Sequence, residues 1–278
     1  MTENKIWFIT GAGRGLGKEF AIAALQRGDK VAATARNLDD VGDLVEKFGD
    51  DVLPVRLDVT DRPSVFAAVE QATGHFGRLD VVVNNAGYGL FGAVEELSEQ
   101  QLRDQLEVNL FGVLHVTQAV LPVLRGQGSG HIVQISTIGG VAAFPSLGGY
   151  HASKWALEGL SESLAQEVAP FGITVTLVEP GGFATDWAGS SAVHATAQPQ
   201  YDSLRQAMAE RRRAGGPVPT AGDPVAAGQA LLAIVDADEP PLRVFFGVTP
   251  TMIVPTLYQA RLDNWEKWKH VAVAAHGH

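Results

Sequence analysis

The sequence of 278 residues contains no cysteine, which excludes disulfides and metal sites built on thiolate ligands. Long apolar runs are absent as well. The run Ile6–Ile9 is too short for the core of a signal peptide and far below the roughly 18 residues of a membrane span. We expect the closing histidines, His276 and His278, to be a frayed end and not metal ligands. The sequence therefore predicts a cytoplasmic protein with no metal site and no membrane contact.

Positive charge is also scarce. The chain has 21 lysines and arginines against 31 aspartates and glutamates, a net charge of −10, and it has no long basic stretch. Non-specific nucleic-acid binding depends on cations that neutralise phosphates, so nucleic acid is not an expected partner. Hydrophobic residues make up 46% of the chain, as in ordinary globular proteins, which excludes a disordered or collagen-like chain.

Short apolar segments alternate with helical stretches along most of the chain. Segments such as Val81–Val83 lack polar alternation, which is typical of a parallel sheet covered by helices on both faces. The alternation predicts an α/β fold with one doubly wound, Rossmann-type sheet. Because no internal repeat or linker is found, we expect a single domain over residues 1–278. The predicted strands are residues 5–9, 31–34, 52–57, 79–83, 131–135, 173–178 and 242–246, and two of the predicted helices are 19–27 and 100–124.

Two segments depart from this alternation. Residues 185–223 are rich in Ala, Ser, Gln and Pro without a clear strand pattern, and a stretch of this length is expected to be a lid over a substrate site. Residues 248–278 are a C-terminal extension with a helical pattern. We expect its Trp265 and Trp268 to pack on the body of the protein or on a partner subunit.

A glycine-rich turn follows the first predicted strand. Gly11, Gly15 and Gly17 fit the pattern G-x-x-x-G-x-G, whereas the commoner G-x-G-x-x-G does not fit. Residues without Cβ let backbone N–H groups and a helix N-terminus approach a pyrophosphate. A tight turn with no ligand is the alternative, but the position between a strand and a helix near the N-terminus favours a dinucleotide site that includes Arg14 and Leu16.

The end of the second predicted strand indicates which dinucleotide binds. A site for NAD places an acidic residue there to bind the ribose hydroxyls. Ala35 and Arg36 stand at that point, and Arg36 together with Arg14 can pair with the 2′-phosphate of NADP. We therefore predict NADP, with NAD as the alternative because Asp39 and Asp40 follow closely.

Tyr150 and Lys154 form a candidate acid–base pair. Their spacing of four residues places both on one face of a helix. The pKa of an unperturbed tyrosine is about 10, so acid–base work near neutral pH requires a pKa about 3 units lower. A nearby ammonium and a helix N-terminus both favour the phenolate, and we expect both to act on Tyr150.

Several ordered motifs resemble the short-chain dehydrogenase/reductase family over residues 5 to about 247. A Y-x-x-x-K pair alone is common, but six motifs in the same order are specific. They are the glycine turn, Asp58 before Val59, Asn84-Asn85-Ala86-Gly87, Asn109, Tyr150 with Lys154, and Pro180-Gly181 before Thr185. The resemblance implies seven parallel strands in the order 3-2-1-4-5-6-7.

The resemblance also implies an oxidoreductase that transfers hydride between nicotinamide C4 and a carbonyl carbon, interconverting a ketone or aldehyde with an alcohol. Tyr150 would exchange the proton on oxygen, and Lys154 would hold the ribose and lower the tyrosine pKa. The family's serine falls at Thr137, 13 residues before Tyr150, where the hydroxyl can still orient a carbonyl; Ser136 is the alternative. Asn109 would break a helix and hold a water in a proton relay.

The remaining family positions imply contacts to the cofactor. Asp58 with Val59 and the turn Asn85-Ala86-Gly87 would contact adenine and ribose, although Asp58 is equally placed to cap a helix near Thr60. Pro180, Gly181 and Thr185 would approach the nicotinamide.

We expect an NADPH-dependent reductase of an apolar carbonyl compound that forms a homodimer or homotetramer. The apolar character is indicated by Phe144 and Trp187 near the expected lid. The alternative from another class is a dinucleotide-sensing regulator without turnover. The replacement of the family's serine by Thr137 is the one feature that favours it, and the presence of Tyr150, Lys154 and Asn109 is against it.

Overall fold

A computed structural model describes residues 4–213 and 221–277. Seven parallel strands form one sheet in the order β3-β2-β1-β4-β6-β7-β9. Strands β5 (Leu90–Phe91) and β8 (Val193–His194) belong to a second sheet, so when the strands of the main sheet are counted from 1 to 7 this is the predicted order 3-2-1-4-5-6-7. The alternation of strands and helices therefore predicted the fold class correctly, and the family resemblance implied the observed strand order. The strands are β1 Ile6–Ile9, β2 Lys30–Ala35, β3 Val52–Arg56, β4 Val81–Asn84, β6 Gly130–Ile135, β7 Ile173–Pro180 and β9 Arg243–Phe246.

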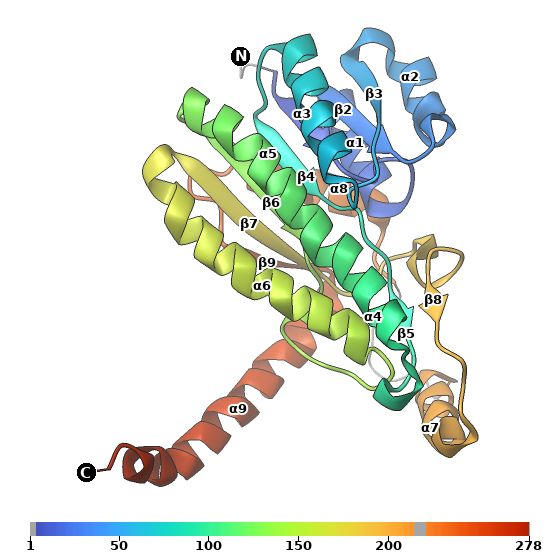
Figure 1. Cartoon of the computed structure of the whole chain (residues 1–278), viewed down its shortest axis with the longest axis vertical. Coiled ribbons are helices and arrows are strands. Elements are labelled where there is room, and N and C mark those ends of the chain that lie inside the picture. Colours follow the sequence, from blue (N-terminus) through green and yellow to red (C-terminus); the bar gives the residue numbers. More distant parts are fainter. Residues whose placement is uncertain (1–3, 214–220, 278) are drawn as a thin grey trace.

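Helices cover both faces of this sheet (Figure 1). One layer contains α1, α2 and α8, and the other contains α3, α5 and α6. A shorter helix, α4, leads into α5, and α7 and α9 lie outside the two layers. The helices are α1 Gly15–Arg27, α2 Gly42–Phe48, α3 Arg62–Phe76, α4 Glu99–Leu106, α5 Gly112–Gln127, α6 Gly148–Val168, α7 Asp202–Arg213, α8 Pro224–Val235 and α9 Val248–Ala275.

The first strand shows why the sheet needs two helical layers. Its side chains point alternately to opposite faces, and all four residues are buried. Trp7 and Ile9 belong to the apolar cluster of α1 and α8, whereas Ile6 and Phe8 belong to the cluster of α3 and α5. A strand buried on both faces has no position for a polar residue, and the run Ile6–Ile9 has none.

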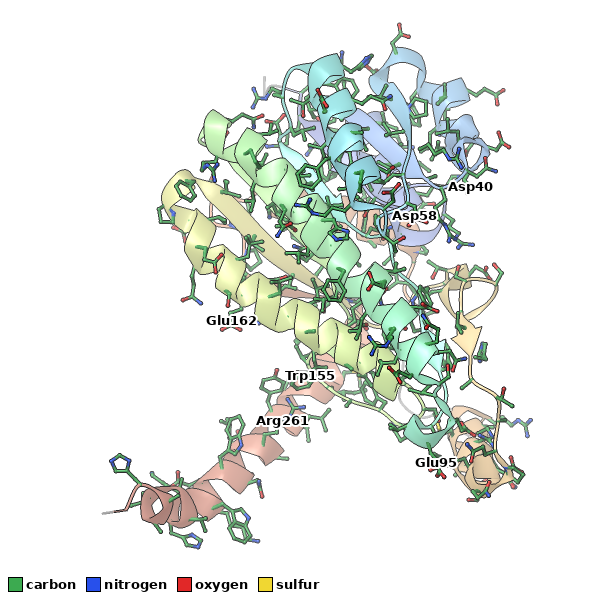
Figure 2. All side chains as sticks on the ribbon, viewed as in Figure 1. Asp40, Asp58, Glu95, Trp155, Glu162 and Arg261 are labelled. Atoms are coloured by element: carbon green, nitrogen blue, oxygen red, sulfur yellow. The ribbon has the colours of Figure 1, made fainter. Side chains whose placement is uncertain are left out.

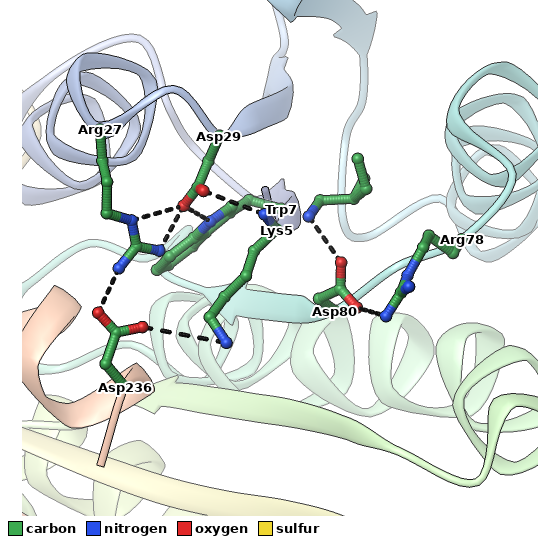
Figure 3. Close-up of polar contacts among 8 residues, drawn as sticks. Lys5, Trp7, Arg27, Asp29, Arg78, Asp80 and Asp236 are labelled. Atoms are coloured by element: carbon green, nitrogen blue, oxygen red, sulfur yellow. Dashed lines mark hydrogen bonds and ion pairs between the residues drawn. The ribbon is translucent and has the colours of Figure 1, made fainter. Parts of the chain in front are cut away.

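The glycine turn follows the carboxyl end of β1, and a network of charged groups holds the amino end of this strand (Figure 3). The buried carboxylate of Asp29 accepts hydrogen bonds from the indole N–H of Trp7 at 2.8 Å and from the backbone N–H of Lys5 at 3.0 Å. Arg27 pairs with Asp29 and also with Asp236 at the end of α8. These bonds join β1, α1 and α8 at the amino end of β1, away from the glycine turn.

Several predictions of local structure need correction. The first helix begins at Gly15 and not at residue 19, because the glycine turn leads directly into it. The predicted helix 100–124 is interrupted by a π-helical turn at Glu107–Phe111. The lid segment contains a strand, β8 Val193–His194, which pairs with β5 Leu90–Phe91 in a second, two-stranded sheet. Part of the predicted lid, residues 214–220, lies outside the described residues.

The C-terminal extension is a helix, as its pattern predicted, but most of it projects away from the sheet (Figure 1). Trp265 and Trp268 are 66% and 54% exposed, so the expectation that they pack on the body of the same chain is wrong. Near its start the helix does contact the body. Figure 2 shows Arg261 beside Trp155 of α6, and the guanidinium lies 5.0 Å from that ring.

One helical stretch in the described part of the chain, Glu99–Gln127, is long and apolar enough to cross a membrane. Within it, Val116, Val120 and Leu124 are fully buried between α5 and the sheet. A helix that packs in a protein core meets the same criteria of length and hydropathy, so this single stretch is weak evidence for a membrane span.

Candidate active site

A cavity of about 1010 Å³ lies at the carboxyl ends of the strands, where ligands bind in open α/β sheets. It collects residues from the loops after six strands, β1, β2, β3, β4, β6 and β7. Of the residues predicted to act in catalysis or cofactor binding, all but Gly17 and Asn109 line it. These lining residues are Gly11, Arg14, Gly15, Leu16, Arg36, Asp58, Val59, Asn85, Ala86, Gly87, Thr137, Tyr150, Lys154, Pro180, Gly181 and Thr185.

The glycine turn forms one wall of the cavity. Gly11 and Gly15 have φ angles of +66° and +56°, which L side chains rarely adopt. Helix α1 begins at Gly15, and the side chain of Arg14 makes no capping bond within the described residues. The first N–H groups of α1 are therefore available to an anion from the cavity.

Gly17 does not line the cavity, and its lack of a side chain serves close packing. A Cβ atom at this position would lie 2.3 Å from the side-chain nitrogen of Asn85 and 2.4 Å from the carbonyl oxygen of Gly11. That nitrogen donates to the carbonyl oxygens of Thr10 and Gly11 at 2.9 and 3.0 Å. Gly17 thus lets α1 pack closely against the Asn85 turn behind the wall.

Charges of both signs surround the end of the cavity near β2. Arg14 and Arg36 line it, and so does Asp40, whereas Asp39 is not among the lining residues. Figure 2 shows Asp40 and Asp58 on the same side of the molecule. Burial raises the pKa of Asp58, but hydrogen bonds from Thr60 and the nearby charge of Arg36 outweigh it and keep the pKa low.

Asp58 combines the two tasks considered for it. Its carboxylate accepts hydrogen bonds from the N–H of Thr60 at 3.0 Å and from the Thr60 hydroxyl at 2.7 Å, just before α3 begins. It also lines the cavity. An ionised carboxylate fixed in this way can accept further hydrogen bonds from a ligand in the cavity.

Tyr150 and Lys154 lie in the first two turns of α6, and both are buried at the base of the cavity. Burial lowers the pKa of Lys154 to about 8, although the Glu158 carboxylate acts in the opposite direction. The ammonium of Lys154 donates to the carbonyl oxygen of Ile135 at 2.8 Å.

The expected lowering of the Tyr150 pKa is not found. Burial raises the pKa of this phenol above its ordinary value, and the hydrogen bond with Thr137 offsets only part of the increase. Desolvation of the phenolate is the larger effect in this site. Tyr150 therefore holds its proton at neutral pH, although the raised pKa makes this phenol a weaker acid than the expected lowering would have done.

The two hydroxyl candidates after β6 point to different partners. Thr137 interacts with Tyr150, and its hydroxyl donates to the carbonyl oxygen of Pro180 at 3.3 Å. Ser136 instead donates to the buried carboxylate of Glu158. The geometry thus brings Thr137, and not Ser136, together with the tyrosine.

Asn109 lies in the π-helical turn and is fully buried. Its side-chain nitrogen donates to the Tyr88 carbonyl oxygen and to the Ser153 hydroxyl, each at 3.1 Å, and its side-chain oxygen accepts from the N–H of Tyr88 at 3.2 Å. These bonds join the turn to the loop after β4 and to α6. A helix interrupted at Asn109 is what the family resemblance implied.

His151, which was not among the predicted site residues, lines the cavity beside Tyr150. Its Nε2 accepts a hydrogen bond from the N–H of Phe144 at 3.0 Å, so its Nδ1 carries the proton and donates to the Gly139 carbonyl oxygen at 2.9 Å. The ring therefore clamps the loop that carries Phe144. No sequence signal distinguishes this histidine from a packing residue.

An aromatic side chain covers the tyrosine. The ring of Trp187, from the lid segment, lies 5.0 Å from the ring of Tyr150 and 5.4 Å from that of Phe91. With Phe144, Leu147 and Val193, it gives this end of the cavity an apolar lining. Such a site excludes water from the phenol and favours an uncharged reactant.

The donor set fits a nicotinamide dinucleotide. The glycine turn and the N-terminus of α1 can hold a pyrophosphate, and Asp58 and the Asn85 turn can hold a nucleoside. Lys154 can hold a ribose next to Tyr150, with a reacting carbonyl between Tyr150 and Thr137. The described residues contain no group of three His, Asp or Glu side chains that could hold a metal ion.

Comparisons with known proteins agree with this geometry. The chain is 45% identical to oxidoreductase BOA17 of Botryotinia fuckeliana over 274 residues, covering 98% of this chain and 99% of that protein. The 3-ketodihydrosphingosine reductase of Bacteroides thetaiotaomicron is 44% identical over 184 residues, covering 65% of each chain.

Solved structures show the same fold. A short-chain dehydrogenase from Streptomyces avermitilis has a TM-score of 0.89 and 36% identity, covering 99% of both chains. A Burkholderia cenocepacia homologue in complex with NADP has a TM-score of 0.74 and 26% identity, covering 95% of this chain and 97% of that one. A Burkholderia phymatum homologue in complex with NAD has a TM-score of 0.75 and 27% identity, covering 87% and 89%.

The family model for short chain dehydrogenases matches residues 5–195, which is more than half of the chain. This match includes the glycine turn, Asn109, Thr137, Tyr150 and Lys154. The chain belongs to the short-chain dehydrogenase family of oxidoreductases, which act on alcohol and carbonyl groups with a nicotinamide dinucleotide.

Proposed function

We propose that this oxidoreductase is an NADPH-dependent reductase of an apolar ketone or aldehyde. The observation that carries the proposal is the placement of Tyr150, which lines the cavity with Thr137 and Lys154 and lies beneath the ring of Trp187. A proton donor in a dry, apolar pocket suits reduction of an uncharged carbonyl compound. Family membership favours this activity over the dinucleotide-sensing regulator.

The bound dinucleotide would supply the hydride, and the protein would do the rest. Thr137 orients the carbonyl oxygen through its hydroxyl, and Tyr150 donates the proton that this oxygen gains. Lys154 holds the ribose and carries a positive charge near the phenol, which stabilises the phenolate left behind. Asn109 fixes the turn between α4 and α5 beside Ser153 of α6, and we propose that it holds the water that returns a proton to Lys154.

The proposed substrate class follows from the residues around Tyr150. We propose a single domain in which residues 185–223 form the lid and supply Trp187 and Val193 to the cavity. The Bacteroides relative is named as a reductase of 3-ketodihydrosphingosine, a ketone on a long apolar chain. A ketone with a sizeable apolar substituent fits the end of the cavity that Phe144, Leu147 and Trp187 line better than a small keto acid.

The preference for NADPH is supported by Arg14 and Arg36, which line the end of the cavity near β2. Either guanidinium can pair with a 2′-phosphate, and a charge-assisted hydrogen bond of this kind contributes about 1.5–3 kcal/mol. Asp40 lines the same end and opposes a second negative charge there. We propose that the two arginines outweigh this single carboxylate.

The test is the rate of NADPH and NADH oxidation with a panel of apolar ketones, aldehydes and keto acids. We expect kcat/KM with NADPH to exceed that with NADH by at least about 10-fold, the value of one charge-assisted contact. Arg36→Ala should raise the KM for NADPH and leave that for NADH unchanged, which is the sign of a lost ground-state contact. Arg56→Ala, an exposed arginine at the end of β3 outside the cavity, is the control.

Two results would overturn parts of this proposal. If no carbonyl compound supports oxidation of either cofactor, the assignment as a carbonyl reductase fails. If the protein prefers NADH, or if Arg36→Ala affects both cofactors equally, the assignment of the 2′-phosphate site fails while the reductase assignment stands.

A further inference from the structure

Ile135, Ser136 and Thr137 follow one another at the end of β6. The first two of them are bonded to helix α6. The Lys154 ammonium donates to the carbonyl oxygen of Ile135 at 2.8 Å, and the Ser136 hydroxyl donates to the carboxylate of Glu158. Lys154 and Glu158 are one turn apart on α6. The next residue after these two anchors is Thr137, whose hydroxyl faces Tyr150 of the same helix.

Glu158 is built into a fixed position. It is 5% exposed, and its second carboxylate oxygen accepts a hydrogen bond from Arg243 of β9 at 3.0 Å. Gly140 packs over the Ser136–Glu158 bond, because a Cβ at residue 140 would lie 2.5 Å from the serine hydroxyl and 2.9 Å from the glutamate oxygen. A side chain at residue 140 would therefore displace the bond.

The same arginine reaches the strand on the other side of Thr137. Arg243 lies 3.6 Å from the buried carboxylate of Glu179 in β7 and also pairs at 2.7 Å with Glu162, which Figure 2 labels on α6. Glu179 directly precedes Pro180, whose carbonyl oxygen accepts the Thr137 hydroxyl at 3.3 Å. Contacts from α6 and β9 thus hold both strand ends that surround Thr137.

We propose that Glu158 is a positioning residue, which through Ser136 and Arg243 sets the Thr137 hydroxyl against Tyr150. The proposal rests on the roles proposed above for Thr137 and Tyr150. It also explains why two hydroxyl residues follow β6: one anchors the strand end and the other faces the reacting group. Misplacement of a catalytic group by about 1 Å can cost about 100-fold in rate, so an anchor of this kind affects kcat more than binding.

The test compares Ser136→Ala, Glu158→Gln, Glu158→Ala and the double variant Ser136→Ala/Glu158→Ala with the unmodified protein. We expect Glu158→Ala to lower kcat by about 10- to 100-fold while the Kd for NADPH changes less than about 2-fold. Glu158→Gln keeps an acceptor for the serine hydroxyl and should recover part of that loss. Because Ser136 and Glu158 act through one bond, the double variant should be no slower than Glu158→Ala alone.

Amide hydrogen exchange on the protein without substrate or cofactor gives a readout that does not depend on activity. The N–H of Gly140 donates to the Thr137 carbonyl oxygen at 2.8 Å, and that of Gly139 donates to the Thr137 hydroxyl at 3.2 Å. Ser136→Ala should raise deuterium uptake at these two amides. This variant removes only one hydroxyl, so it remains informative if Glu158→Ala does not fold.

Glu162→Ala is the matched control, because Glu162 pairs with the same arginine but its side chain is 54% exposed and makes no bond to Ser136. We expect its kcat within about 2-fold of the unmodified protein and its exchange at Gly139 and Gly140 unchanged. Wild-type kcat and exchange in Ser136→Ala and Glu158→Ala, or equal losses in Glu162→Ala, would contradict the proposal. If the unmodified protein reduces no carbonyl compound, the proposed function fails, and the exchange experiment still decides whether Glu158 anchors the strand end.

Discussion

At the scale of single residues, the site separates two adjacent hydroxyls. Both residues line the cavity, but Ser136 is buried and donates to Glu158, whereas Thr137 interacts with Tyr150. The spacing to the tyrosine indicated Thr137, and the placement of the two side chains supports that assignment. The extra methyl group of threonine restricts its side-chain rotation but leaves the hydroxyl able to donate.

Thr137→Ala should lower kcat by about 100-fold, because loss of one donor to the reacting oxygen typically costs that much or more. Thr137→Ser keeps the donor and should stay within about 3-fold of the unmodified protein. Steady-state kinetics of NADPH oxidation measures both. A silent Thr137→Ala variant together with a severely impaired Ser136→Ala variant would show that the orienting hydroxyl is residue 136.

The charged cluster of Glu158, Glu179 and Arg243 predicts that the stability of the fold depends on pH. Burial and the neighbouring Glu158 raise the pKa of Glu179 from 4.5 to about 8, although Arg243 acts in the opposite direction. A carboxyl whose pKa is raised by folding stabilises the fold fully below its unfolded value of 4.5. This contribution declines as pH rises and is lost through the folded value near 8.

Glu179→Gln replaces this carboxyl with a neutral group of the same shape. We expect the Tm of the variant to exceed that of the unmodified protein by at least about 3 °C at pH 8.5, with a smaller difference at pH 5, as a change of about 1 kcal/mol would produce. Thermal unfolding followed by circular dichroism at both pH values measures this. A difference in Tm that does not vary with pH would contradict the raised pKa.

The sequence pattern identified the candidate catalytic side chains but not the surroundings that set their properties. The spacing of Tyr150 and Lys154 predicted a shared helix face, and both side chains line the cavity. The raised pKa of Tyr150 depends on burial beneath the lid, which no local pattern encodes. Glu158 escaped notice for the same reason: its partners Ser136 and Arg243 are 22 and 85 residues away in the chain.

At the scale of elements, the segment proposed as the lid is fastened to the loop after β4. Strand β8 pairs with β5, and the Glu96 carboxylate accepts hydrogen bonds from the N–H groups of Gln198 at 2.7 Å and Ala93 at 2.8 Å. Arg205 of α7 pairs with the same carboxylate. These bonds lower the pKa of Glu96 to about 2, so the carboxylate is ionised and the fastening intact at any pH above about 4.5.

Removal of this carboxylate should loosen the lid. Glu96→Ala is expected to raise the KM for the carbonyl substrate about 5-fold or more and to increase deuterium uptake at residues 193–205, while the Kd for NADPH stays the same. Glu99→Ala, an exposed glutamate that pairs with Arg103 only within its own helix, is the control. Unchanged exchange in Glu96→Ala would mean that remaining contacts such as β5–β8 pairing and the bond from the Tyr201 hydroxyl to Glu95 hold this segment without the Glu96 carboxylate.

Element types were predictable where the pattern was long. Each of the seven apolar segments is a strand of the main sheet, with boundaries that differ from the predicted ones by two residues or fewer. Strands β5 and β8 have two residues each, too few for a period to show. The π-helical turn at Asn109 was implied by the family and not by the apolar pattern, since side-chain contacts to the loop after β4 hold it.

At the scale of the whole molecule, α9 projects from the body (Figure 1). Arg261 anchors its inner half by donating to the Val141 carbonyl oxygen at 3.0 Å and by lying on Trp155. Beyond this anchor, Leu262, Trp265 and Trp268 are at least half exposed. Exposed apolar patches of this kind mark interaction sites, which agrees with a homo-oligomer as the proposed assembly.

We expect the paired substitution Trp265→Ser/Trp268→Ser to shift the protein toward smaller species in light scattering after size-exclusion chromatography. The reason is that two indole side chains leave the contact between protomers. Val273→Ser, also exposed on α9 but closer to its end, is the control. An unchanged molar mass in the tryptophan variant would show that assembly does not use this face of α9.

The proposed mechanism depends on the proton that Tyr150 donates to the carbonyl oxygen. Tyr150→Phe removes the phenolic hydroxyl and leaves the ring that packs against Trp187, so the fold and the cofactor site should be unaffected. In stopped-flow measurements of NADPH oxidation with an apolar ketone, we predict a rate about 10²–10⁴-fold below that of the unmodified protein, with an unchanged Kd for NADPH by fluorescence. A Tyr150→Phe variant that oxidises NADPH at nearly the unmodified rate would contradict the assignment of Tyr150 as the proton donor.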